Sequence, residues 1–171
     1  MKEIKFSKTN ILQKDINLVG KIIKSGWLTH GKYTKKFEDE FKKYTKSKYA
    51  VSVSSCTAGL HLSCLASGFK KGDEVIVPAQ THTATAHAIE YTGAKAIFTD
   101  INKITGNISL KDIKQNFTKK TKGVIIVHMA GYPCDLEEII KFCKKKTWSY
   151  LKIVRMLLEQ NIKQNMLEIM D

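Results

Sequence analysis

The chain has 171 residues, a formal net charge of +13, 43% hydrophobic and 26% charged residues, which is ordinary for one soluble domain with a hydrophobic core. It contains no apolar run of about eighteen residues, which excludes a predicted membrane span. The first residues, MKEIKFSKTNILQKD, lack the apolar core of a secretion signal. We therefore expect a cytoplasmic protein that does not enter a membrane.

The cysteines and the positive charge give little support for metal or nucleic-acid binding. The cysteines show no CxxC spacing and no companion His at zinc-ligand spacing, so we expect reduced thiols that mostly pack in the core; they are Cys56, Cys64, Cys134 and Cys143. The positive residues are almost all Lys, scattered along the chain, and Arg155 is the only Arg. This pattern favours a solvated Lys-rich surface over a nucleic-acid interface.

The first third of the chain predicts two helices, at residues 10–25 and 34–46, with GWLTHGK as the loop between them. Aromatic residues recur at helical spacing in the second helix. A strand is expected at residues 48–54 (KYAVSVS), because small and β-branched residues alternate there. A helix over residues 56–68 should follow and end at Gly68.

Beyond this helix, short β-branched runs alternate with helical segments. The predicted strands are residues 74–78, 95–101 and 123–129. The predicted helices are residues 81–93, a segment from a cap at Ser109 through Phe117, and LEEIIKFCKKK after a cap at Asp135. This βα alternation predicts an α/β domain with a mostly parallel sheet.

The tail after Lys146 breaks the alternation. Another buried strand is expected there, but the sequence offers a loosely amphipathic helix instead, with apolar residues Leu151, Val154, Leu158 and Ile162. A C-terminal helix packed on the sheet would account for this pattern.

In SVSSCTAGLHL a predicted strand of small residues runs directly into a helix. Backbone N–H groups and the hydroxyls of Ser55 and Thr57 should then lie at the helix N-terminus. Unpaired amides and the helix dipole favour a phosphate at such a place. A Ser or Thr here can equally be a helix cap and nothing more.

Five segments in order extend this motif: GWLTHGKYTKKFEDEF, KYAVSVSSCTAGLHL, GDEVIVPAQTHTATAHAI, YTGAKAIFTDI and TKGVIIVHMAGYPCDLEEI. This set resembles the DegT/DnrJ/StrS family of pyridoxal-phosphate-dependent sugar aminotransferases, from about Trp27 to Lys146. The resemblance implies the large α/β domain of the aspartate aminotransferase-like fold (fold type I), here incomplete. Residues 1–46 would form an N-terminal helical segment, 47–146 part of the cofactor-binding domain, and 147–171 a tail outside the family.

The resemblance also implies roles for individual residues. Family members anchor the cofactor phosphate with a Thr-Ala step that matches Thr57 and Ala58, next to Ser55. An aromatic or His side chain at the position of His82 stacks on the pyridine ring, although His82 could simply start a helix. Thr29 matches a position near the substrate end of the pocket, or is an ordinary polar loop residue.

Two further positions leave alternatives open. Cys56 stands where many members of the family carry Gly, which affects the tightness of the phosphate turn. His128 ends a predicted strand at the carboxyl edge of the sheet, where open α/β folds bind ligands. It could equally be a core histidine with satisfied hydrogen bonds.

The chemistry of the cofactor requires two more groups, a Lys that forms the Schiff base and an Asp that keeps the pyridine nitrogen protonated. In the family the Asp lies in a strand reading roughly (I/L)ED-x-A-x-A-x-G, just after the helix that matches residues 135–146, and the Lys follows later. Neither motif is present in the sequence. The resemblance therefore assigns no catalytic residue and no metal, and we expect no turnover.

A shifted reading frame would supply the missing strand. If the third base of each codon is read with the first two of the next, LKIVRMLLEQNIKQNMLEIMD permits EDCAHAIGAKYKTKYVGNYG. The break would fall at the run of lysines that ends at Lys146. We hypothesise that residues from about Thr147 are translated in a shifted frame, and we expect the sheet to lose a central strand and expose an apolar edge.

By resemblance, the activity is transfer of an amino group from an amino-acid donor to a nucleotide-linked keto sugar, for cell-surface polysaccharide or amino-sugar synthesis, in a homodimer. One alternative is a short basic protein that binds nucleic acid or another partner through the α/β scaffold and the tail helix. It predicts retention on heparin that falls steeply with salt. The other alternative is a remnant without function.

Overall fold

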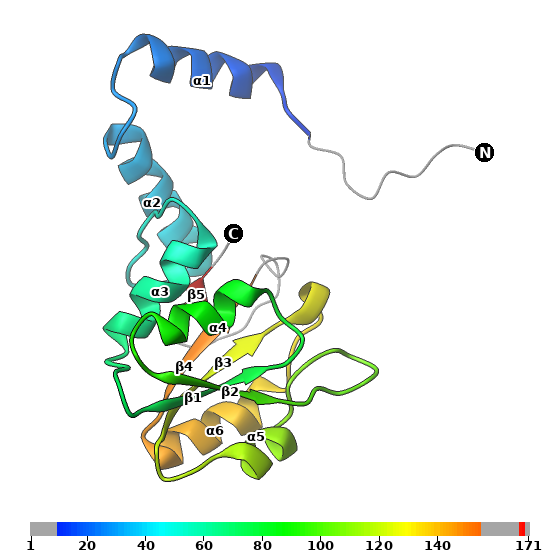
Figure 1. Cartoon of the computed structure of the whole chain (residues 1–171). Coiled ribbons are helices and arrows are strands. Elements are labelled where there is room, and N and C mark those ends of the chain that lie inside the picture. Colours follow the sequence, from blue (N-terminus) through cyan, green and yellow to red (C-terminus); the bar gives the residue numbers. More distant parts are fainter. Residues whose placement is uncertain (1–9, 155–167, 170–171) are drawn as a thin grey trace, which may run out of the picture. The chain divides into compact units, whose positions relative to one another are not determined.

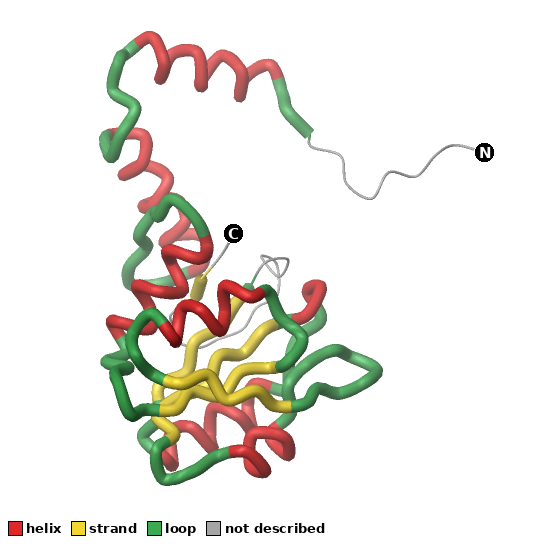
Figure 2. The backbone as a smooth tube through the Cα atoms, viewed as in Figure 1, coloured by secondary structure: helices red, strands yellow, loops and turns green. Residues whose placement is uncertain are grey.

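The computed structural model describes residues 10–154 and 168–169 and divides into two compact units, Met1–Ser52 and Val53–Asp171. The first unit holds the helices α1 (Gln13–Lys24) and α2 (Lys32–Thr45), as Figure 1 shows. The second unit holds a parallel sheet with helices on both faces, which Figure 2 shows in yellow and red.

Helices α1 and α2 occupy the two predicted ranges. The backbone N–H of Leu12 donates to the Asp15 carboxylate at 2.9 Å, which closes the start of α1. Between the helices, the Trp27 indole N–H donates to the carbonyl of His30 at 2.8 Å and so folds the loop on itself. No residue of α1 or α2 is buried, so neither helix contributes a side chain to a hydrophobic core.

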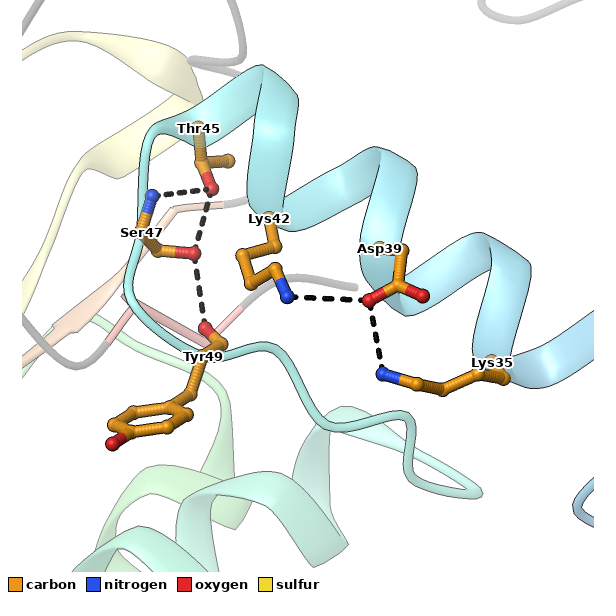
Figure 3. Close-up of polar contacts among 6 residues, drawn as sticks. All are labelled: Lys35, Asp39, Lys42, Thr45, Ser47 and Tyr49. Carbon is orange, nitrogen blue, oxygen red and sulfur yellow. Dashed lines mark hydrogen bonds and ion pairs between the residues drawn. The ribbon is translucent and has the colours of Figure 1, made fainter.

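Polar side chains stabilise α2 along one side and at its end (Figure 3). Lys35 and Lys42 contact the Asp39 carboxylate at 2.9 and 3.2 Å, and the hydrogen bond from Lys35 is the main cause that lowers the pKa of Asp39. At the C-terminal end the Thr45 hydroxyl donates to Ser47, which donates to the carbonyl of Tyr49. Because these charges are exposed, water screens the ion pairs and their contribution is small.

The strand predicted at residues 48–54 is wrong. Residues in this range have no strand assignment and pair with no described strand. Tyr49 and Val51 are 74% and 77% exposed. The backbone N–H of Ser52 donates to the Glu38 carboxylate at 2.9 Å rather than to another strand. The sequence has strand propensity, but a strand also needs a neighbour that accepts its backbone hydrogen bonds.

The second unit contains a sheet of five described strands in the order β2-β1-β3-β4-β5, all parallel. The strands are β1 (Glu74–Pro78), β2 (Lys95–Thr99), β3 (Thr121–Val127), β4 (Ser149–Ile153) and β5 (Glu168–Ile169). The helices are α3 (Cys56–Ala66), α4 (Thr83–Glu90), α5 (Leu110–Asn116) and α6 (Leu136–Lys146), and a short 3-10 helix, η1 (Met129–Gly131), follows β3. The predicted α/β class and mostly parallel sheet are confirmed.

The sheet is buried on both faces, as expected of parallel sheets in α/β domains. Successive residues of β1 point to opposite sides: Val75 and Val77 pack in a core layer with α3 and α4, whereas Ile76 packs in a second layer with α5 and α6. All three side chains are fully buried. Strands of this kind are continuous apolar runs in the sequence. Such a run predicts the strand but does not indicate which side chains face which core layer.

The predicted caps differ in how they are used. The Ser109 hydroxyl accepts from the N–H of Asp112 at 3.3 Å, which confirms the cap of α5. Asp135 does occupy the cap position of α6, but its side chain makes no capping hydrogen bond.

The helix predicted for the tail is wrong for its first part, and so is the expected loss of a strand after α6. Residues 149–153 form β4, which pairs in parallel with β3 from Gly123↔Ser149 to Val127↔Ile153. Leu151 is 1% exposed and lies in the core layer with α3 and α4. Burial beside β3 therefore outweighs the helical spacing. The predicted helix positions Leu158 and Ile162 lie outside the described residues.

The residues around β4 are well packed. Trp148 contacts Phe117 and Phe142 edge-on, with ring centroids 5.6 and 5.5 Å apart, in the layer with α5 and α6. β4 also buries Lys152, which is 1% exposed. β4 is therefore enclosed along its length.

Three of the four cysteines are packing residues, as predicted. Cys64, Cys134 and Cys143 are free and buried, and burial raises the pKa of each thiol to about 12. Because the thiolate is the reactive form, these groups are chemically inert in the folded unit. Cys56, which is only partly buried, is the exception.

Candidate functional site at the carboxyl edge of the sheet

The carboxyl ends of β1, β2 and β3 lie at one edge of the sheet because the strands are parallel. The loops that follow them, residues 79–82, 100–109 and 128–135, carry most of the polar groups of this edge. Open α/β sheets bind ligands at this edge. The predicted cofactor residues lie at the N-termini of α3 and α4, which pack on the same face of the sheet.

The N-terminus of α3 has the geometry predicted for a phosphate cradle. Ser55 is in extended conformation and its hydroxyl oxygen accepts from the N–H of Ala58 at 3.2 Å, while its carbonyl accepts from the N–H of Gly59 at 3.0 Å. Ser55 and Thr57 are exposed. The first turn of α3 contains no acidic residue, so nothing within it neutralises the positive end of the helix dipole.

Both predicted functions of Ser55 are compatible with this geometry. Its oxygen caps the helix through Ala58, and its hydroxyl hydrogen can still donate to a bound anion. Cys56, the departure from the family pattern, packs against the core layer beneath α3. Its side chain therefore takes up space under the helix rather than in the cradle.

His82 starts α4. Its ring nitrogen Nδ1 accepts from the N–H of Ala84 at 3.1 Å, which places the proton of the neutral ring on Nε2. The side chain is exposed. His82 therefore begins α4, which is compatible with both predicted roles, and the cap fixes the imidazole orientation while the ring stays accessible.

His128 is a core residue. It is 3% exposed, its Nδ1 accepts from the N–H of Cys134 at 3.0 Å, and its own N–H donates to the carbonyl of Ile153 at 3.3 Å. These bonds join the end of β3 to its following loop and to β4. The structure therefore places His128 in the core at the end of β3, with its Nδ1 hydrogen-bonded, and both alternatives for its role stay predictions.

Thr29 is exposed, in the loop between α1 and α2. It belongs to the first unit, whereas Ser55, Thr57, Ala58 and His82 belong to the second.

Asn107 is a site residue that the sequence analysis missed. It is 4% exposed, and its side-chain amide bonds to two backbone groups of the loop after β3. A cavity of about 510 Å³ lies between the two joined loops and the start of α6, with Asn107, Tyr132, Asp135 and Glu138 among its lining residues. The sequence signal was weak, since ITGNIS reads as an ordinary turn.

Residues 10–154 and 168–169 contain neither a candidate metal site nor a candidate membrane span. Within these ranges, no group of three or more His, Cys, Asp or Glu side chains is placed to hold a metal ion. No helix in the same ranges has the length and hydropathy needed to cross a membrane.

These features define a class of protein: a parallel α/β domain with an open helix N-terminus and a capping histidine at the ligand-binding edge. The sequence model of the DegT/DnrJ/EryC1/StrS aminotransferase family matches residues 9–152, and the chain belongs to this family. Its sheet and helices are part of the large domain of fold type I aminotransferases, as predicted. The match extends on both sides of the predicted span, which ended at Lys146.

Relatives and solved structures agree with this assignment. The chain is 41% identical to GDP-perosamine synthase of Escherichia coli O157:H7 over 147 residues, covering 85% of this chain and 40% of that enzyme. It superimposes on an aminotransferase of Psychrobacter cryohalolentis with a TM-score of 0.83 and 32% identity, covering 87% and 38% of the two chains.

A second structure, NtdA of Bacillus subtilis with bound cofactor PMP, superimposes with a TM-score of 0.77 and 30% identity, covering 80% of this chain and 32% of NtdA. The chain thus spans about two fifths or less of each of these proteins.

Proposed function

We propose that this chain carries the phosphate-binding part of a pyridoxal-phosphate site, in the setting of an aminotransferase that acts on nucleotide-linked keto sugars. Ser55, Thr57 and Ala58 hold the cofactor phosphate at the start of α3, and His82 stacks on its ring. The main support for this proposal is the N-terminus of α3, which is exposed, capped by a hydroxyl and free of acidic residues in its first turn. The cofactor found in NtdA supports this proposal.

The substrate class follows from the relatives. GDP-perosamine synthase is named for a nucleotide-linked amino sugar, so we assign to the family activity a nucleotide-linked keto sugar and an amino-acid donor. From the family resemblance alone, we also propose a substrate-binding role for Thr29. The setting we propose is a homodimer in the cytoplasm.

When bound, the cofactor supplies an electron sink for chemistry at the amino group. The residues of this chain bind and orient it. The α3 amides and the Ser55 and Thr57 hydroxyls would donate hydrogen bonds to the phosphate, and the positive end of the helix dipole would favour its charge. The hydrogen bond from the Ala84 N–H to Nδ1 holds the imidazole of His82 in one orientation. The imidazole would then offer a fixed surface to the pyridine ring of the cofactor.

We further propose that the described chain binds the cofactor without turnover. The resemblance places the pyridine-binding Asp in the strand just after the helix that matches residues 135–146. That strand is β4, whose residues Ser149–Ile153 include no carboxylate and end in Lys152 and Ile153. Without a carboxylate there, nothing in β4 keeps the pyridine nitrogen protonated.

The shifted frame is a separate proposal. The family match and β4 both extend past Lys146, so the residues just after that point form a strand in the sequence as it stands. Nucleotide sequence from the Lys144 codon onward is the test. We expect a second open reading frame that encodes EDCAHAIGA. Stop codons in the other frames just after this point would contradict the proposal.

Two matched variants of Ser55 test the cradle. Asp and Asn are both good helix caps, so Ser55→Asp and Ser55→Asn should both preserve α3. Ser55→Asp adds a negative charge where the phosphate binds, and we expect pyridoxal-phosphate affinity to fall at least about tenfold at low salt, a typical effect of a like charge at short range. Ser55→Asn should bind within a few fold of the unsubstituted chain.

The measurement is a titration followed by absorbance and by quenching of Trp fluorescence, with circular dichroism to confirm folding. Ser67→Ala, at the opposite end of α3, is the control for loss of a hydroxyl. Borohydride reduction followed by peptide mapping should give no stoichiometric label on a single Lys. Equal binding by the Asp and Asn variants would contradict the cradle, and one dominant labelled Lys would contradict the absence of turnover.

A further inference from the structure

The side chain of Asn107 links the loops after β2 and β3. Its Oδ1 accepts from the N–H of Met129 at 2.9 Å, and its Nδ2 donates to the carbonyl of Tyr132 at 2.9 Å. Its own carbonyl accepts from the N–H of Asn102 at 2.9 Å, and its N–H donates to the hydroxyl of Thr105 at 3.3 Å. Donor and acceptor of the amide are thus both used, in a residue that is 4% exposed.

The segment that Asn107 holds has an uncommon backbone conformation. Ala130 has φ 49° and ψ 27°, in the left-handed region that residues with a Cβ seldom adopt, and Gly131 follows with φ 83°. The two hydrogen bonds of the Asn107 side chain, to Met129 and to Tyr132, lie on either side of this pair. Such a conformation persists only where the surrounding structure holds it in place. The side chain of Asn107 supplies two of the hydrogen bonds that do so.

The loop after β1 lies close to Gly106, next to Asn107 in the loop after β2. A Cβ added at Gly106 would lie 2.9 Å from Cγ of Met129 and 3.7 Å from Oε1 of Gln80. Gln80 precedes His82 by two residues in the loop that leads into α4. The three loops therefore meet at Gly106 and Asn107, and the absence of a side chain at Gly106 permits their close approach.

The geometry points to Asn107 as a positioning residue for the ligand-binding edge. It fixes the loop after β3 against the loop after β2, and this joined wall sets the position of the loop that carries His82. Asn107 itself need not touch the ligand. This inference rests on the proposed cofactor site, because the positioned group is the ring-stacking His82.

Three variants separate positioning from general stability. Asn107→Ala removes both bonds to the loop after β3. Asn107→Asp keeps an acceptor for Met129 but, while ionised, removes the donor to Tyr132 and sets a carboxylate oxygen against that carbonyl at a buried position. The control is Asn102→Ala: its Oδ1 accepts only from Ile104 and Thr105 of its own loop in the described contacts.

We expect amide hydrogen exchange at Met129 to accelerate at least about tenfold in Asn107→Ala and to change little in Asn102→Ala, because a lost hydrogen bond exposes that amide. We expect pyridoxal-phosphate affinity to fall about fivefold or more in Asn107→Ala and in Asn107→Asp at neutral pH, and not at all in Asn102→Ala. Exchange and affinity are measured on the full chain, with circular dichroism as the check on folding.

The outcomes distinguish the two proposals. Faster exchange at Met129 without loss of affinity would overturn the positioning role and leave the cradle intact. If the unsubstituted chain binds no pyridoxal phosphate, the proposed function fails, and unchanged exchange in Asn107→Ala would independently overturn the link between the loops. If Asn107→Ala does not fold, Asn107→Asp decides: affinity equal to that of the unsubstituted chain would count against positioning.

Discussion

Replacing Leu151 by alanine is expected to lower the free energy of unfolding of the second unit by about 2–5 kcal/mol, the usual range for such a change in a packed core. Leu151 is 1% exposed and pairs in register with Ile125 at the middle of β3. The alanine would leave a cavity between the sheet and the layer of α3 and α4. The effect is large because β4 contributes to both core layers.

Urea denaturation followed by circular dichroism measures this change. Leu62→Ala is the matched control, because Leu62 is 53% exposed on α3 and should change the free energy of unfolding by less than about 0.5 kcal/mol. If the two variants are equally stable, β4 is not part of the folded sheet. The experiment therefore also tests the correction of the predicted tail helix.

Gly123→Ala is expected to destabilise the second unit by about 1–3 kcal/mol or more, the range for overpacking a close-packed interior. A Cβ at this position would lie 2.5 Å from Cζ of Phe69 and 2.7 Å from the carbonyl oxygen of Ser149. The ring of Phe69 can move, but the carbonyl belongs to the backbone of β4. Insertion of one methyl group thus pushes β4 away from β3.

A double-mutant cycle separates the two clashes. Phe69→Leu shortens the side chain that meets the new methyl group, so Gly123→Ala should cost less in that background than in the original one. The clash with Ser149 remains, so the rescue should be partial. Full stability of Gly123→Ala alone, measured by urea denaturation, would contradict the close approach of β3 and β4.

Much of the fold was predictable because its elements are locally determined. β1, β2 and β3 are short apolar runs between turn residues, and α6 places its apolar residues on one face. The two errors both concern tertiary partners. Residues 48–54 have strand propensity without a described neighbour, whereas residues 149–153 have an ambiguous pattern and a neighbour, β3, that decides it. The periodicity of a segment does not show which neighbouring strand it will pair with in the folded sheet.

The helix-start positions of two proposed site residues were predictable from the sequence. Ser55 and His82 lie at helix starts, and a change from small or polar residues to helical periodicity marks such positions. Asn107 was missed because its importance comes from burial and from bonds to residues 22 and 25 positions away. Its neighbours in sequence are ordinary turn residues, so only the folded structure distinguishes it.

The strand order has a consequence for synthesis of the chain on the ribosome. β2 pairs on one side of β1, and β3 and then β4 are added successively on the other side. Because the chain is made from its N-terminus, β2 is placed first, and the sheet then grows only on the other side of β1, where the most recently made strand, β3 and then β4, is the open edge. That edge is the usual place for pairing with another chain. Pauses in translation between β3 and β4 would therefore prolong exposure of the apolar edge of β3, and the gap of some twenty residues that contains α6 sets the length of that interval.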